Sequence, residues 1–152
     1  MGNITVGWRE WLSLPDLGIE RIKAKIDTGA RTSALHAYFV EPFVENDTEM
    51  IRFGIHPLQK HLNPEVVCQC PIKDFRPVRD SGGHEEMRYV IETTIKLGGL
   101  IRKVEMTLTN RDNMKFRMLL GRTALQGMFV APDQSYLFGR ALAKTKMKEK
   151  FL

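Results

Sequence analysis

The sequence predicts an all-β barrel with one short helix, and three observations lead to that fold class. Many short segments alternate apolar with polar residues, as strands with one buried face do. Gly98-Gly99 separates two long alternating segments, which is a strong β-hairpin signal. Only one segment, residues 122–126, has the pattern of a helix start. The 152 residues suffice for one domain with a real core.

The N-terminal half is expected to form strands that lead into one central loop. Residues 4–14 are expected to form a bent strand or a strand pair, followed by a turn at residues 15–18, where proline and glycine fit. Residues 19–26 complete a hairpin. Further strands are predicted at residues 32–44, 50–55 and 66–70, with a turn at Asn46-Asp47. The polar residues 73–86 are predicted to be a mobile loop, either a substrate lid or a plain connection.

The C-terminal half continues the pattern of short strands. Strands are predicted at residues 85–97, 100–109, 116–120, 128–130 and 135–138, with a turn at residues 109–113. We expect one domain from residue 1 to residue 139. Residues 140–152 form a separate tail, rich in alanine and lysine, which is either helical or disordered.

Composition narrows the range of functions. The chain holds 23 Lys and Arg against 18 Asp and Glu, a formal net charge of +5. Such a balance is compatible with nucleic acid, an acidic peptide or the ribosome as a partner, and equally with a basic protein that has no such partner. No nucleic-acid-binding motif is present. No apolar run reaches the ~20 residues of a membrane span, and no signal peptide is visible. Cys68 and Cys70 are too few for a disulfide scaffold, so we expect a cytoplasmic protein.

The candidate functional stretch is Asp27-Thr28-Gly29-Ala30, at the end of the strand predicted for residues 19–26. Glycine permits a tight turn, and a strand followed by small residues can hold an aspartate in a fixed pose at a cleft. The alternative is an ordinary strand-to-loop turn with a local aspartate hydrogen bond. A second element, Met118-Leu119-Leu120-Gly121-Arg122, favours the functional interpretation.

These two elements resemble, in the same order, the paired motifs of retroviral-type aspartic proteases. In that group a strand with an apolar-apolar-Gly-Arg sequence passes through the loop that carries the aspartate. More closely, the chain resembles the bacterial family named ATP-dependent zinc proteases, which is retropepsin-like, from about Val6 to Gly139. The resemblance implies a closed retropepsin-like barrel. It rests on residues 24–37, 56–58, 119–122 and 135–137.

The resemblance implies an aspartic peptidase with Asp27 as the catalytic residue. Thr28, Gly29 and Ala30 would shape its loop, while Gly121 and Arg122 would support it. Two carboxylates sharing one proton are needed, so Asp27 from two subunits of a homodimer would meet. Asp80-Ser81-Gly82 is a variant of the motif, but it follows no apolar strand and is interpreted as a loop turn. The flap that closes over substrate would lie near residues 56–61.

Three alternatives remain open. The four histidines and the Cys68-X-Cys70 pair could supply zinc ligands, but no known zinc spacing is present, so no metal and no cofactor are predicted. No ATP-binding loop occurs either.

Members of the family that the chain resembles are associated with ATP-grasp ligases that append glutamate to protein tails, so the resemblance implies such a ligase as a partner. A glutamate-rich peptide would then be the substrate. Besides a zinc-dependent hydrolase, the alternatives are a peptide-binding module that has lost peptidase activity and a regulator of an ATP-grasp ligase.

Overall fold

The computed structural model describes residues 4–58, 65–79, 82–110 and 115–138. Within these ranges the chain forms twelve strands and one 3₁₀ turn. In chain order they are β1 (Ile4–Gly7), β2 (Arg9–Leu14), η1 (Pro15–Leu17), β3 (Ile19–Ile26), β4 (Ser33–His36), β5 (Phe39–Glu45), β6 (Thr48–Ile55), β7 (Val66–Pro71), β8 (Asp74–Arg79), β9 (Glu85–Leu97), β10 (Leu100–Thr109), β11 (Met118–Leu120) and β12 (Met128–Ala131).

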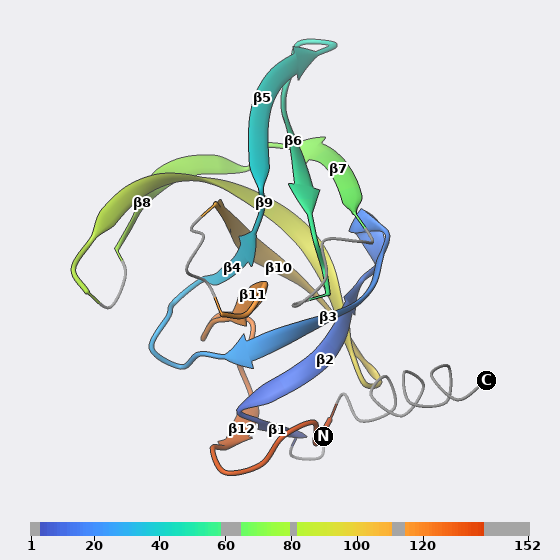
Figure 1. Ribbon diagram of the computed structural model, residues 1–152, viewed down its shortest axis with the longest axis vertical. Coiled ribbons are helices and arrows are strands. Elements are labelled where there is room, and N and C mark those ends of the chain that lie inside the picture. Colours follow the sequence, from blue (N-terminus) through green and yellow to red (C-terminus); the bar gives the residue numbers. More distant parts are fainter. Residues whose placement is uncertain (1–3, 59–64, 80–81, 111–114, 139–152) are drawn as a thin grey trace.

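Six strands form a closed ring, which confirms the predicted all-β barrel. The order of neighbours is β10, β4, β11, β3, β2 and β9, and β9 pairs again with β10 to close the ring (Figure 1). The shortest strand pairing in the ring is between β2 and β9, where Ser13 pairs with Lys96. The longest is between β9 and β10, which begins with Leu97 opposite Leu100 beside the Gly98-Gly99 turn.

The core is formed by the strands of this ring and extends to β6, whose Ile51, Phe53 and Ile55 are fully buried. Along β3 the side chains of Ile22, Ala24 and Ile26 are buried, whereas Lys25 between them is exposed. This alternation is what a strand with one face toward a core requires. The other barrel strands contribute Leu12, Leu14, Leu35, Ile91, Ile95, Met106, Met118 and Leu120, each fully buried.

Two outer elements extend from the barrel. Strands β5, β6 and β7 form a separate antiparallel sheet, whose β5–β6 hairpin points away from the barrel in Figure 1. Asn46 and Asp47 both have positive φ at the tip of that hairpin, as the predicted turn requires. The first half of β9 also leaves the barrel, pairs with β8 and curves back in an arch.

The first and last described segments of the chain meet beside β2. Strand β1 pairs in parallel with β12 in a sheet of its own. The fully buried carboxylate of Glu10 accepts hydrogen bonds from the backbone N–H groups of Gly7, Leu137 and Phe138, at 2.7, 2.9 and 3.2 Å. Tyr136, in the same segment, has φ of 57°. The N–H groups of Leu137 and Phe138 therefore bind Glu10, that of Tyr136 binds the Arg9 carbonyl, and the strand predicted for residues 135–138 is wrong.

Three other predicted elements differ from the structure. The helix start predicted at residues 122–126 is a series of turns whose N–H groups donate to the carbonyl three residues earlier, and it ends at Gly127, whose φ is 79°. The short helix among the described residues is instead the 3₁₀ turn Pro15–Leu17. The strand predicted for residues 32–44 is two strands in different sheets. The loop predicted for residues 73–86 contains strand β8. The tail at residues 140–152 and the turn residues 111–113 lie outside the described residues.

Candidate active site

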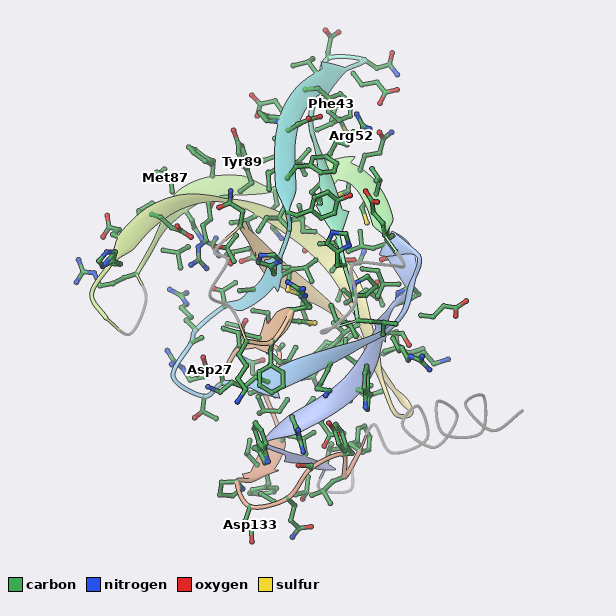
Figure 2. All side chains as sticks on the ribbon, viewed as in Figure 1. Asp27, Phe43, Arg52, Met87, Tyr89 and Asp133 are labelled. Carbon is green, nitrogen blue, oxygen red and sulfur yellow. The ribbon has the colours of Figure 1, made fainter. Side chains whose placement is uncertain are left out.

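Asp27 is the first residue after β3. Its backbone N–H donates to the Leu120 carbonyl oxygen (2.9 Å), and its Oδ1 accepts from the Gly29 N–H (3.0 Å). The loop closes with the Ala30 N–H on the Asp27 carbonyl oxygen at 3.3 Å. The aspartate is half-buried, while Thr28 and Gly29 are exposed. One carboxylate oxygen is thus anchored to the loop, and Figure 2 shows the side chain on the side over which β8 and β9 curve.

Strand β11 passes between the two strands that the Asp27 loop connects. It pairs in parallel with β3, with Leu120 opposite Ile26, and antiparallel with β4, with Leu119 opposite Ala34. The loop from Asp27 to Thr32 must therefore bridge β11. This is the threading that the two sequence motifs predict.

Gly121 and Arg122 fasten the threaded strand to the loop. The Gly121 N–H donates to the Ser33 hydroxyl (3.0 Å), and the Arg122 N–H donates to the Ala30 carbonyl (2.8 Å). The Arg122 Nη1 donates to the Thr28 carbonyl at 3.0 Å. A Cβ on residue 121 would lie 2.7 Å from the Thr32 carbonyl carbon, so only glycine fits without a shift. Both residues thus contact the loop that carries Asp27, as their predicted supporting role requires.

A cleft of about 900 Å³ opens beside Asp27. Its lower wall is the Asp27 loop with Ala30, and its opposite wall is β8 from Arg76 to Arg79. The described lining residues include five arginines and one lysine but only two acids: Lys25, Asp27, Arg31, Arg76, Arg79, Arg88, Glu105 and Arg122. The cleft is therefore strongly basic around one central aspartate.

Glu105, the other acid of the cleft, is held by two cations. Its carboxylate lies 3.0 Å from Arg76 Nη2 and 3.4 Å from Lys73 Nζ. The hydrogen bond from Arg76 is the largest cause that lowers the pKa of Glu105 below its usual value. This carboxylate is thus kept ionised and is poorly suited to donate a proton.

The β8–β9 hairpin takes the place that the sequence analysis gave to a flap near residues 56–61. His56 lies away from the cleft and stacks on Tyr38 with ring centroids 4.3 Å apart. Residues 59–64, including His61, are outside the described residues, as are Asp80 and Ser81. Two basic residues of the segment 73–86, which was predicted as a lid or a connection, do line the cleft: Arg76 and Arg79 of β8. Lys73 instead forms ion pairs with Glu92 and Glu105.

The described metal-ligand residues do not converge. No group of three or more His, Cys, Asp or Glu side chains in the described ranges could hold a metal ion. Cys68 is buried and contacts the Leu17 carbonyl (3.5 Å), His36 is buried beside Arg117, and His84 is exposed. Burial raises the pKa of both Cys68 and Cys70 to about 11, which disfavours the thiolate that metals bind.

The sequence analysis missed four charged residues that line the cleft: Lys25, Arg31, Arg88 and Glu105. Two of them carried a usable signal. Lys25 lies two positions before Asp27 in a segment that alternates apolar and polar residues, and Arg31 directly follows Ala30 of the active-site loop. Arg88 and Glu105 lie far away in sequence, and only the fold of β9 and β10 brings them here.

Comparison with known protein families decides the assignment. Residues 5–140 match the RimB-like model, described as the retropepsin-like aspartic endopeptidase RimB. The chain belongs to this family. The match confirms the retropepsin-like part of the resemblance seen in the sequence, but it carries no reference to zinc or ATP.

Individual relatives add two facts. Proteins named probable alpha-L-glutamate ligase are 42% identical over 135 residues in Shewanella pealeana and 44% identical over 137 residues in Parasynechococcus marenigrum. These matches cover 88% and 90% of this chain but only 30% and 29% of the relatives, so the chain spans less than a third of their length. The crystal structure of Lpg0085 from Legionella pneumophila, of unknown function, matches with a TM-score of 0.72 at 25% identity, over 90% of this chain and 98% of that one.

No helix in the described part of the chain is long and apolar enough to cross a membrane.

Proposed function

We propose that this RimB-like protein is an aspartic-type peptidase whose catalytic pair is Asp27 from each of two subunits. The observation that carries the proposal is the position of Asp27. It lies on a loop bridged over β11, half-buried at a basic cleft, with one carboxylate oxygen fixed by Gly29.

Among its described residues, one chain supplies a single suitable carboxylate. Asp27 is the single aspartate among the described residues that line the cleft, and Glu105 is paired with Arg76 and Lys73. A second copy can reach the site because Thr28 and Gly29, next to Asp27, are exposed. A two-fold axis beside this loop would bring two equivalent aspartates together.

The reaction follows from such a pair sharing one proton. The ionised carboxylate accepts a proton from a water molecule as the water oxygen bonds to the scissile carbonyl carbon. The protonated partner donates its proton to the carbonyl oxygen. The tetrahedral intermediate then breaks its C–N bond, and the proton taken from water goes to the leaving amine. One hydroxyl of the intermediate returns its proton to the carboxylate that had donated one, so that the C=O bond re-forms and the pair again shares one proton. Since the pair needs one proton, activity falls when both carboxylates ionise.

The cleft favours an extended, acidic peptide as substrate. Strand β8 is at the end of its sheet and, among the described residues, pairs only with β9, so its outer edge can accept a peptide strand. The surplus of arginine around Asp27 complements carboxylate side chains. Relatives named as glutamate ligases support a glutamate-rich chain as the acidic substrate.

The test is hydrolysis of a glutamate-rich peptide by wild type and by Asp27→Asn, with the solution mass measured by light scattering at several concentrations. We expect a dimer that cleaves the peptide, and an Asp27→Asn dimer that binds it without cleavage. A strict monomer, or an Asp27→Asn variant that still cleaves, would contradict the proposal.

A second candidate is a peptide-binding module that regulates an ATP-grasp glutamate ligase. It is favoured by relatives more than three times longer than the matched region, in which a related domain is part of a protein named as a ligase. In that case wild type and Asp27→Asn would bind the acidic peptide equally well, and neither would cleave it.

A further inference from the structure

The cations of the cleft fall into two groups. The first group lies on the β8–β9 hairpin, and each member has an acidic partner. Arg76 pairs with Asp74 and Glu105, at 3.2 and 3.0 Å. Likewise, Arg79 pairs with Glu85 at 3.3 Å, and Arg88 pairs with Glu86 at 2.6 Å. The positive charges of this group are therefore largely balanced by acidic side chains of the protein itself.

The second group flanks Asp27 and lacks acidic partners. Within the described parts of the chain, the side chains of Arg31 and Lys25 make no hydrogen bond or ion pair, and the Arg122 side chain donates only to the Thr28 carbonyl oxygen. All three side chains are exposed and line the cleft. An exposed cation without a partner keeps its full capacity to attract an anion.

Lys25 and Arg31 lie on opposite sides of Asp27 along the chain. Lys25 precedes it by two residues and lies on β3, and both residues line the cleft. Arg31 follows the turn, where its carbonyl oxygen accepts a hydrogen bond from the Thr123 N–H at 3.0 Å. The backbone on both sides of the aspartate is therefore fixed, by β3 and by this bond.

We propose that Arg31 and Lys25 form a carboxylate-binding subsite beside Asp27 that makes the cleft selective for acidic peptides. This inference rests on the proposed function and assigns its substrate selectivity to two residues. The bound carboxylate has two possible sources: an acidic side chain near the scissile bond, or the C-terminal carboxylate of the peptide. Arginine suits either, because its guanidinium can donate two parallel hydrogen bonds to a carboxylate.

The test measures binding in the Asp27→Asn background, so that it does not depend on catalysis. Three fluorescent peptides of equal length are compared by anisotropy at low and high ionic strength. One carries glutamates and an amidated C-terminus, one carries glutamines and a free C-terminus, and one carries glutamines and an amidated C-terminus. Arg31→Gln, Lys25→Gln and the charge-preserving Arg31→Lys are added in turn. Lys103→Gln, an exposed cation on β10 that does not line the cleft, is the matched control.

We expect Arg31→Gln to weaken binding of one carboxylate-bearing peptide about tenfold, Lys25→Gln to weaken it less, and Arg31→Lys to restore part of the loss. The losses shrink at high salt. If Arg31→Gln weakens binding of the glutamate peptide, the subsite recognises an acidic side chain. If it weakens binding of the glutamine peptide with a free C-terminus, the subsite recognises the C-terminal carboxylate. Equal affinities of Arg31→Gln and Lys103→Gln for both peptides would overturn the proposal. Absence of hydrolysis by the Asp27 enzyme would count against the peptidase alone, since this binding comparison would be unaffected.

Discussion

At the scale of single residues, the site depends on how closely Gly121 approaches the active-site loop. A methyl group there would lie 2.7 Å from the Thr32 carbonyl carbon and 3.0 Å from the Ala30 carbonyl oxygen. Both atoms are backbone and cannot rotate away. The same backbone holds Arg122 and, through Ser33, the start of β4. A small change at this glycine therefore moves the loop that carries Asp27.

We expect Gly121→Ala to lower the free energy of unfolding by about 1–3 kcal/mol, as overpacking does, and to remove peptidase activity. Urea unfolding and the peptide assay measure the two effects. Gly99→Ala is the control, because a Cβ at residue 99 meets no atom within 4 Å. Equal stability of the two variants would contradict the close approach described for Gly121.

The two cysteines give a second prediction at this scale. Burial raises the pKa of Cys68 and Cys70 to about 11, so both remain thiols at neutral pH. Alkylation by iodoacetamide should be slow in the folded protein near pH 8, rise as the pH approaches about 11, and be fast at pH 8 in denaturant. Mass spectrometry measures the rates. Equally fast alkylation of folded and denatured protein at pH 8 would show that the thiols are not protected.

At the scale of elements, local pattern predicts the strands whose partners are near in sequence. The β9–β10 hairpin agrees with the prediction to the residue, because two glycines and long alternation determine it locally. Strand β8 was missed because its sequence is polar and contains Pro77, which argues against a strand. It is a strand in the structure because it pairs with the arched half of β9. The strand expected at residues 135–138 fails for a similar reason, since Glu10, far away in sequence, captures its N–H groups.

The same arch gives a prediction about pH. The Arg76 guanidinium joins β8 to Glu105 on β10 and holds the pKa of Glu105 below its usual value. A lowered folded-state pKa stabilises the fold above the unfolded-state pKa of about 4.3, and this contribution is lost as the pH falls further. The difference in free energy of unfolding between wild type and Glu105→Gln should therefore shrink below about pH 4.3.

Urea unfolding over a pH series measures this difference. Glu20→Gln is the control, since Glu20 is exposed on β3 and its side chain has no ion pair among the described residues. Its difference from wild type should change little over the same series. A Glu105→Gln difference that is equally independent of pH would show that the Arg76 contact does not stabilise the ionised form.

At the scale of the whole molecule, the sequence predicted the barrel and the proximity of Gly121 and Arg122 to the Asp27 loop. Two short motifs, about 90 residues apart in the chain, indicated that β11 passes through the Asp27 loop. The balance of charge in the cleft could not be predicted. Net charge is a property of composition, whereas the division into paired and unpaired cations depends on which acids the fold brings next to β8.

The same scale contains the central claim, that a working site needs Asp27 from two subunits. Wild type should be mixed with increasing Asp27→Asn at constant wild-type concentration, under conditions that let subunits exchange, and peptide hydrolysis measured. With random pairing, half of the wild-type subunits pair with the variant when the two are present in equal amounts, so the activity falls to about one half. An excess of Asp27→Asn lowers the activity further. Activity that stays constant at every ratio, with exchange verified by mass, would show that one Asp27 suffices and would contradict the account.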